Sequence, residues 1–186
     1  TRALAFKDYL QETGRKLTVN DLVLRAAVLA LLRHPRVNSR IEGNRVSYFR
    51  QVNLGVAVGL DAGLVVPVIL NAGALGIDAL AGEARRIVGA AREGKLIGMG
   101  RGTFTVTNLG MFGVESFSAI INPPEAGILA VGAAKDAVAV KDRTLTLTKV
   151  MKLTVSVDHR VVDGILAAKF LNSIKEFLEN PESLSA

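Results

Sequence analysis

The 186-residue sequence contains no cysteine and only two histidines, His34 and His159. Without cysteine the chain cannot form disulfides, bind zinc or iron–sulfur clusters through thiolates, or use a cysteine nucleophile. Two histidines leave little material for a histidine-based metal site, so we predict that the protein binds no metal. The absence of cysteine fits any cellular compartment.

Long uncharged runs are also scarce. The best candidate, Val52–Ile77, contains one charged residue, Asp61. The triplet Asp61-Ala62-Gly63 is a turn sequence between two apolar runs of strand length, Leu54–Leu60 and Leu64–Leu70. Glycines in the first run and a proline in the second disfavour a helix, whereas the valines suit strands. We therefore predict a buried hairpin here and no membrane-spanning helix.

The charge balance is basic, because 23 Lys+Arg face 17 Asp+Glu. A basic surface favours an anionic partner, although an ordinary solvated surface is the plain alternative. The basic residues stand singly or in pairs, such as Arg15-Lys16 and Arg85-Arg86. No zinc-finger, helix-turn-helix or RNA-binding-sheet pattern accompanies them, so we predict no binding to nucleic acid.

Apolar spacing and turn residues predict the elements. Four helices are expected, over about Leu4–Gly14, from Thr18 or Asn20 to His34-Pro35, over Leu75–Arg92, and from Gly164 onward. Strands are expected over Val46–Phe49, the hairpin, Thr103–Thr107, Ile128–Ala134, Ala137–Val140, Thr144–Thr148 and Lys152–Val157, with an extended stretch at Phe117–Ile121 and a turn at Asn122-Pro123-Pro124. Each of the last three helices is expected to bury one face. These faces are Leu22, Ala26, Leu29 and Leu32 in the second helix, Leu80, Ala84, Ile87 and Ala91 in the third, and Leu166, Phe170, Ile174, Phe177 and Leu178 in the last. This pattern predicts one α+β domain, residues 1–186, with a mixed or mostly antiparallel sheet.

Several common catalytic motifs are absent. Gly98-Met99-Gly100 precedes a strand, whereas dinucleotide binding needs such glycines after a strand and before a helix. The chain has no phosphate-binding loop with Gly-Lys-Ser/Thr and no Gly-x-Ser-x-Gly elbow. These absences exclude nucleotide-hydrolysing and α/β-hydrolase functions.

One histidine stands where chemistry is plausible. In Ser156–Gly164 a predicted strand runs into His159, then a turn, then Asp163 at the start of the last helix. Histidine can take and return a proton near neutral pH, and a carboxylate is favoured at a helix N-terminus. The alternative is a buried histidine with satisfied hydrogen bonds and an aspartate that only caps the helix.

The strand Thr103–Thr107 offers a second candidate. Strand alternation places its three threonines on one face and its two apolar residues on the other. A threonine hydroxyl can donate a hydrogen bond to a developing oxyanion, and Thr107, at the strand end, is best placed for this. The alternative is a solvent-facing threonine stripe.

The segment Asp158–Gly164 resembles the His-x-x-x-Asp-Gly motif of the dihydrolipoamide acyltransferases, the core components of 2-oxo acid dehydrogenase complexes. The chloramphenicol acetyltransferases share its shorter form. Thr103–Gly113 and Phe117–Gly132 are similar to the family members of pyruvate dehydrogenase complexes in particular, and the resemblance continues to about Pro181. It implies a chloramphenicol-acetyltransferase-like two-layer sandwich, in which helices pack on a mixed, mostly antiparallel sheet.

The resemblance also implies an activity, the transfer of an acetyl group between a dihydrolipoyl arm and coenzyme A. It makes His159 the base that deprotonates the coenzyme A thiol, and Thr107 the hydroxyl that stabilises the oxyanion. Asp163 corresponds to the motif aspartate, which holds the geometry of the site. Phe117 and Leu129 are expected along the thiol-bearing channel.

The family resemblance implies partners too. We expect a homotrimer with active sites between subunits, assembled into a hollow cubic or icosahedral core that binds lipoyl domains, the decarboxylase and dihydrolipoamide dehydrogenase. Family domains begin with a further stretch that carries a basic partner for the motif aspartate, so the chain is expected to be truncated at its N-terminus. The lipoyl group is expected on an upstream domain. The expected location is the cytoplasm in a bacterium or the mitochondrial matrix in a eukaryote.

Three alternatives stay open at this point. The acyl group could be succinyl or branched-chain, as in related complexes. The domain could be a catalytically silent core scaffold, but such relatives lose the histidine that this chain keeps. A free-standing acetyltransferase acting on a small hydroxyl compound is the third, and it would not be expected to share the Asn122-Pro123-Pro124 region.

Overall fold

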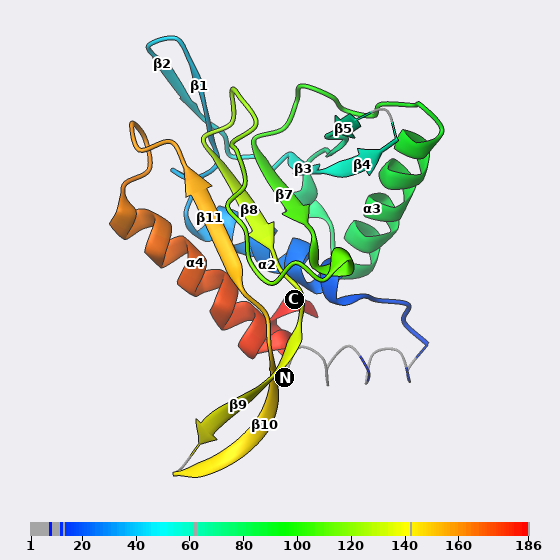
Figure 1. Cartoon of the computed structure of the whole chain (residues 1–186). Coiled ribbons are helices and arrows are strands. Elements are labelled where there is room, and N and C mark those ends of the chain that lie inside the picture. The colour runs from blue at the N-terminus through cyan, green and yellow to red at the C-terminus, as the bar shows by residue number, and fades with distance from the viewer. Residues whose placement is uncertain (1–7, 9–11, 13, 62, 142, 186) are drawn as a thin grey trace.

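The structure is a computed structural model that describes residues 8, 12, 14–61, 63–141 and 143–185 (Figure 1). The α-helices with described bounds are α2 (Val19–Arg33), α3 (Ile77–Arg92) and α4 (Gly164–Glu179). The strands are β1 (Ser39–Glu42), β2 (Arg45–Tyr48), β3 (Leu54–Val56), β4 (Val58–Leu60), β5 (Gly63–Val65), β6 (Val68–Ile69), β7 (Phe104–Asn108), β8 (Gly127–Val131), β9 (Lys135–Lys141), β10 (Thr144–Val150) and β11 (Leu153–Val157). Short 3-10 helices are η1 (Ala72–Ala74), η2 (Gly110–Phe112) and η3 (Pro181–Ser185). The first predicted helix, Leu4–Gly14, lies almost wholly outside the described residues.

A five-stranded sheet forms the centre of the fold, in the order β11-β8-β7-β3-β6. Its three inner strands, β8, β7 and β3, are parallel to one another, and the two edge strands run antiparallel to their neighbours. Three further antiparallel pairs, β1–β2, β4–β5 and β9–β10, lie outside this sheet. The structure therefore confirms the α+β prediction and the mixed sheet, with antiparallel pairs in the majority among the described strands.

Helix α2 is the central helix. Thr18 begins it with a capping box, in which its side chain accepts a hydrogen bond from the amide of Asp21 while the Asp21 carboxylate accepts one from the amide of Thr18. The prediction of a single buried face was wrong, because α3, α4, η1 and η3 all contact this helix. Val23 and Leu24 are buried outside the predicted face, whereas Leu32, within it, is 45% exposed.

Helices α3 and α4 follow their predicted patterns. Leu80, Ala84, Ile87 and Ala91 are buried on α3, and Phe170, Ile174 and Leu178 are buried on α4. The Phe170 ring packs edge-on against Phe104 of β7, with 5.3 Å between the ring centroids, and so joins the helices to the sheet. Figure 1 shows α2 behind the sheet, α4 beside β11 and α3 beyond β4. Within the described part of the chain, no helix is long and apolar enough to cross a membrane.

The predicted hairpin at 54–70 is present, but only its base is buried. Leu54 of β3 pairs with Ile69 of β6, and both side chains are fully buried. The outer pair, β4 and β5, forms a separate two-stranded piece in which Leu64 is 68% exposed. The chain leaves the five-stranded sheet at Ala57, whose amide donates to the carbonyl of Val106 on β7. The prediction of a wholly buried hairpin was therefore wrong at its tip.

Strands β9 and β10 form an arm, residues 135–150, that projects from the body of the molecule (Figure 1). Val138 lies opposite Leu147, and Val140 lies opposite Leu145, so these four side chains share one face of the ribbon. They are 68%, 77%, 72% and 72% exposed, respectively. The arm therefore presents an apolar face that nothing in a single chain covers, within the part that the structure describes.

Candidate active site

His159 lies in a tight turn directly after β11. The amide of Asp158 donates to the carbonyl of Ala126, and the Asp158 carbonyl accepts from the amides of Val161 and Val162. Both valines are buried and anchor the turn in the core, whereas His159 is exposed. The alternative of a buried histidine is therefore wrong, and the imidazole is open to a reactant.

The two residues that flank His159 form an ion pair across it. The Arg160 guanidinium donates to both oxygens of the Asp158 carboxylate, with distances of 2.9 Å, 3.1 Å and 2.6 Å. The Arg160 amide donates to the same carboxylate at 3.0 Å. This guanidinium holds the pKa of Asp158 below its ordinary value. The pair links the residues on either side of His159, at a turn that the backbone hydrogen bonds of Asp158 close.

Asp163 is the N-cap of α4. Its carboxylate accepts a hydrogen bond of 2.8 Å from the amide of Leu166. That amide, together with the Ile165 amide and the charges of Arg36 and His159, holds the pKa of Asp163 below its ordinary value. The capping role considered for this residue is thus present.

Arg36 is a site residue that the sequence patterns did not single out. It lies between α2 and β1, and its guanidinium donates to the carbonyl of Val161 at 3.4 Å. Its positive charge acts on Asp163, so a basic neighbour of the motif aspartate is present within this chain. A single arginine after the His34-Pro35 break has no pattern of its own, and only the fold brings it to the histidine turn.

The threonines of the β7 region differ in their surroundings. Thr103 and Thr105 are buried, at 1% and 0% exposure. The Thr103 hydroxyl accepts from the amide of Asn53 and donates to its carbonyl, and the Thr105 hydroxyl donates to Glu125 at 2.6 Å. Thr107 is half-buried near the C-terminal end of the strand. The solvent-facing stripe is therefore excluded, and Thr107 is the one of the three that is partly exposed.

His159 and Thr107 do not meet within one chain. Thr107 pairs with Ala130 of β8, which pairs with Thr154 of β11. Val157, the last residue of β11, is about 10 Å further along the sheet at some 3.3 Å per residue, and His159 follows beyond it. The two candidate residues thus lie toward opposite ends of the central sheet.

The two residues predicted to line the channel, Phe117 and Leu129, differ in burial. Phe117 is half-buried in the stretch 117–121, which was expected to be extended and forms no helix or strand in the structure. Leu129 is fully buried in the middle of β8, between Val106 and Val155. Leu129 therefore packs in the core and exposes no surface to a channel in this chain.

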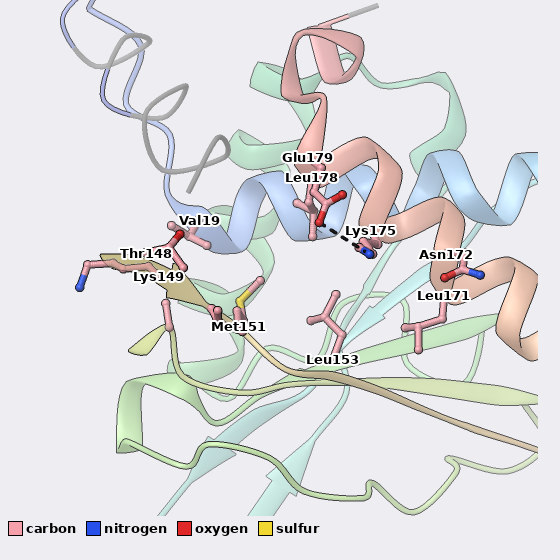
Figure 2. Close-up of a pocket in the computed structure, with 12 residues that line it drawn as sticks. Val19, Thr148, Lys149, Met151, Leu153, Leu171, Asn172, Lys175, Leu178 and Glu179 are labelled. Atoms are coloured by element: carbon pink, nitrogen blue, oxygen red, sulfur yellow. Dashed lines mark ion pairs between the residues drawn. The ribbon is translucent and has the colours of Figure 1, made fainter. Parts of the chain in front are cut away.

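A pocket of about 490 Å³ lies elsewhere, between the start of α2, the end of β10 and α4 (Figure 2). Figure 2 shows apolar side chains, among them Met151, Leu153 and Leu171, and an ion pair between Lys175 and Glu179. Neither His159 nor Thr107 lines this pocket, so it is separate from the candidate site. The described residues contain no group of three or more histidine, aspartate or glutamate side chains that could hold a metal ion.

Comparison with known proteins gives a family match over residues 1–186, to the catalytic domain of the 2-oxoacid dehydrogenase acyltransferases. The chain is 38% identical to the acetyltransferase component of the pyruvate dehydrogenase complex of Rickettsia bellii, over 94% of this chain and 42% of that protein. It is 43% identical to the acetyltransferase component of the acetoin cleaving system of Bacillus subtilis, over 92% of this chain and 44% of that protein. The chain thus spans less than half the length of these relatives.

Solved structures show the same similarity. The dihydrolipoamide acetyltransferase of Azotobacter vinelandii, from a study of the catalytic roles of one serine, one histidine and one asparagine, is 32% identical. It superimposes with a TM-score of 0.87, covering 98% of this chain and 76% of that one. Chloramphenicol acetyltransferase is 16% identical and superimposes with a TM-score of 0.60, over 92% of this chain and 82% of that one. It therefore shares the fold. The two-layer fold predicted from the sequence is therefore confirmed.

Proposed function

The chain belongs to the acyltransferase family of the 2-oxoacid dehydrogenases, and on that premise we propose that it transfers an acetyl group from a dihydrolipoyl arm to coenzyme A. Residues 1–186 would form the catalytic, core-forming domain of a pyruvate dehydrogenase complex. The observation that carries the proposal is an exposed histidine, His159, on a turn that the core and the Asp158–Arg160 pair hold in place.

The Azotobacter enzyme supports this choice of residues. Its studied serine and histidine are separated by the same number of positions as Thr107 and His159. Its histidine and asparagine are separated by the same number as His159 and Asp163. At the first position both proteins have a hydroxyl side chain, serine there and threonine here. At the last position this chain has a carboxylate where the Azotobacter enzyme has an amide.

His159 would act as the general base. A thiol with an ordinary pKa near 8.5 is mostly protonated at neutral pH, so coenzyme A needs a base to become a nucleophile. An imidazole nitrogen takes the thiol proton, and the sulfur attacks the acetyl carbon of the lipoyl thioester. When the intermediate collapses, the bond to the lipoyl sulfur breaks, and the imidazolium returns the proton to that sulfur.

Thr107 would stabilise the intermediate of this reaction. Attack places a negative charge on the former carbonyl oxygen, and the Thr107 hydroxyl can donate a hydrogen bond to it. Asp163 and Arg36 would hold the geometry of the histidine turn, since Asp163 fixes the start of α4 and Arg36 binds the Val161 carbonyl. The excess of basic residues suits the phosphate groups of coenzyme A.

The active site would lie between two copies of the chain. Within one chain, His159 and Thr107 lie toward opposite ends of the central sheet. A shared site therefore needs His159 of one protomer to face Thr107 of another. The exposed apolar face of the arm supports assembly, because monomeric proteins rarely leave such a ribbon uncovered. We propose a homotrimer within a larger hollow core, to which lipoyl domains, the decarboxylase and dihydrolipoamide dehydrogenase bind, in the cytoplasm of a bacterium or the mitochondrial matrix of a eukaryote.

The test is a coenzyme A-dependent assay of the assembled protein with acetyl, succinyl and isobutyryl dihydrolipoamide. We expect acetyl transfer to be the fastest of the three. The His159→Ala variant should lose transfer by at least about a hundredfold, as expected for a general base, with unchanged assembly and unfolding. A preference for succinyl or isobutyryl would reassign the acyl group, and near-normal turnover of the variant would exclude His159 as the base.

A further inference from the structure

Glu125 is a buried carboxylic acid that the proposed mechanism does not use. It is 5% exposed, and it lies between the proline turn at 122–124 and β8. Its Oε2 accepts a hydrogen bond from the Thr105 hydroxyl at 2.6 Å, and its Oε1 accepts one from the Asn122 amide at 3.2 Å. A buried carboxyl group is costly unless its hydrogen bonds are satisfied, so this arrangement needs a reason.

Two glycines make room for this pair. A side-chain carbon at Gly102 would lie 2.2 Å from Oε1 of Glu125, and one at Gly55 would lie 2.7 Å from the Thr105 hydroxyl. A larger residue at Gly102 would therefore push the Glu125 carboxylate, and one at Gly55 would push the Thr105 hydroxyl. Both side chains are buried, so the pair has little free space around it.

The main chain beside Glu125 leads to the histidine turn. The next residue, Ala126, accepts the amide hydrogen of Asp158 through its carbonyl, and its own amide donates to the carbonyl of Ser39. The carbonyl of Pro124 accepts from the amide of Ile41. The segment 122–126 is thus tied to β1 on one side and to the turn of His159 on the other, while the Glu125 side chain ties it to β7.

The surroundings of Glu125 act on its pKa in opposite directions. Burial raises the pKa of Glu125, and the hydrogen bonds from Thr105 and Asn122 and the positive charge of Arg40 act in the opposite direction. Arg40 is paired with Glu42 at 3.7 Å, and its Nε atom is buried with no hydrogen-bond partner among the described residues. A glutamine at position 125 would keep one oxygen to accept the Thr105 hydroxyl hydrogen bond, whereas its NH2 group would replace the oxygen that accepts from the Asn122 side chain. Glu125→Gln therefore tests the bond to Thr105 without the negative charge.

We propose that Glu125 is a positioning residue that, through its bond to Thr105, fixes the segment 122–126 and thereby the place of His159. The inference deepens the proposed function, because it rests on His159 as the reacting base. It assigns a role to two buried residues that do not touch the substrate. Both lie on the histidine side of the sheet, since Thr105 pairs with Ile128 near the start of β8.

The experiment compares Thr105→Val, Glu125→Ala and Glu125→Gln with a matched control, Thr103→Val. The control removes another buried hydroxyl of the β7 region, one that binds only the main chain of Asn53 and has no link to His159. We expect Thr105→Val and Glu125→Ala to lower kcat by about ten- to a hundredfold, since displacements near 1 Å cost that much. Glu125→Gln should restore most of the rate, and the control should stay within about twofold.

A second readout does not depend on activity. The chain has two histidines, so ring signals in NMR spectra can be assigned to His34 and His159 with a His34→Gln variant. Thr105→Val should change the chemical shifts of the His159 ring and leave those of the His34 ring unchanged. The Thr103→Val control should change neither ring signal. If Thr105→Val and Thr103→Val alter kcat and the His159 signal equally, the inference is wrong. If the wild type transfers no acyl group, the proposed function fails, while the His159 signal still decides the positioning role.

Discussion

At the scale of single residues, the side chains proposed to act in catalysis contribute little to the packing of the fold. His159 is exposed and Thr107 is half-buried, whereas the neighbouring Val161, Val162 and Thr105 are buried. Buried neighbours fix the backbone, and accessible side chains meet the reactants. Substitutions at the two accessible positions should therefore change the rate of transfer and leave stability almost unaltered.

Thr107→Val tests the oxyanion role at this scale. The change keeps the shape of the side chain and removes its hydroxyl, so we expect kcat to fall by about 10²–10³, as for other single oxyanion donors. Thr107→Ser keeps a hydroxyl and should retain most of the activity. Steady-state rates with acetyl dihydrolipoamide and coenzyme A measure both variants. A valine variant as fast as the wild type would show that Thr107 only fills space.

His34 should make stability depend on pH. Its Nε2 lies 2.8 Å from the Ser173 hydroxyl, and burial, followed by the charges of Arg33 and Lys169, lowers its pKa. Above the ordinary pKa near 6.5 the ring is neutral in both the folded and unfolded states. Below that value the unfolded chain takes up the proton first, so the free energy of unfolding should fall as the pH drops from 7.5 to 5.

The comparison with His34→Gln isolates this contribution. Burial raises the pKa of Glu125, so its contribution to the free energy of unfolding falls as the pH rises, the reverse of the His34 contribution. Both proteins contain Glu125, so its contribution cancels in the comparison. Urea unfolding at pH 7.5 and pH 5 should show a smaller loss for the variant than for the wild type. Equal losses in the two proteins would mean that the His34 ring titrates alike in both states.

At the scale of elements, the start of α4 joins stability to the site. Asp163 caps this helix through the Leu166 amide, so Asp163→Ala should lower the temperature of thermal unfolding, whereas Asp163→Asn keeps the cap. If the negative charge also holds the histidine turn, its loss in Asp163→Asn should lower kcat by about tenfold, while unfolding changes less than in Asp163→Ala. Melting curves and rates on the same samples separate the two roles. Full activity of Asp163→Asn would reduce Asp163 to a cap.

The elements with a clear apolar periodicity, or with turn residues at their ends, were predictable from the sequence. Leu80, Ala84, Ile87 and Ala91 mark the buried face of α3, and the Asp61–Gly63 turn marks the β4–β5 hairpin. Helix α2 was predicted in position but not in burial, because periodicity cannot show that two other helices pack around a central one. Strand β1 has no clear period, and its pairing with β2 and its hydrogen bond to Pro124 form it.

The site was predictable only in part, for the same reason. His159, Asp163 and Thr107 stand in recognisable local patterns at strand ends and a helix start. Arg36 and Glu125 act through contacts with residues far away in the sequence, and neither has a local signal. Leu129 lies in an apolar run whose members are all buried, so no pattern distinguishes a channel residue from a core residue there.

At the scale of the whole molecule, one chain holds both halves of the proposed site but keeps them apart. Thr107 and His159 lie toward opposite ends of the central sheet, and the arm extends beyond the body with an apolar face. A two-stranded ribbon with exposed valines and leucines is only marginally stable alone. Assembly would cover this face and complete the site at the same time, so activity and oligomeric state should be lost together.

Charges placed on the arm test this coupling. Val140 and Leu145 are opposite each other, so Val140→Lys combined with Leu145→Glu keeps a favourable cross-strand pair but removes the apolar face. We expect association to weaken by at least about tenfold, because the new charges would be desolvated at the contact. Acetyl transfer should fall in proportion, while circular dichroism of the protomer stays unchanged. Analytical ultracentrifugation over a range of protein concentrations measures the association.

The matched control places the same charges on the other face of the ribbon. Ala139 and Thr146 are also opposite each other, so Ala139→Lys with Thr146→Glu introduces an equal pair without touching the apolar side chains. This control should assemble and transfer acetyl groups like the wild type. If both double variants assemble normally, the arm does not mediate contacts between copies. If the first variant dissociates but keeps full activity, His159 and Thr107 cannot act together across an interface, and the shared site would have to be abandoned.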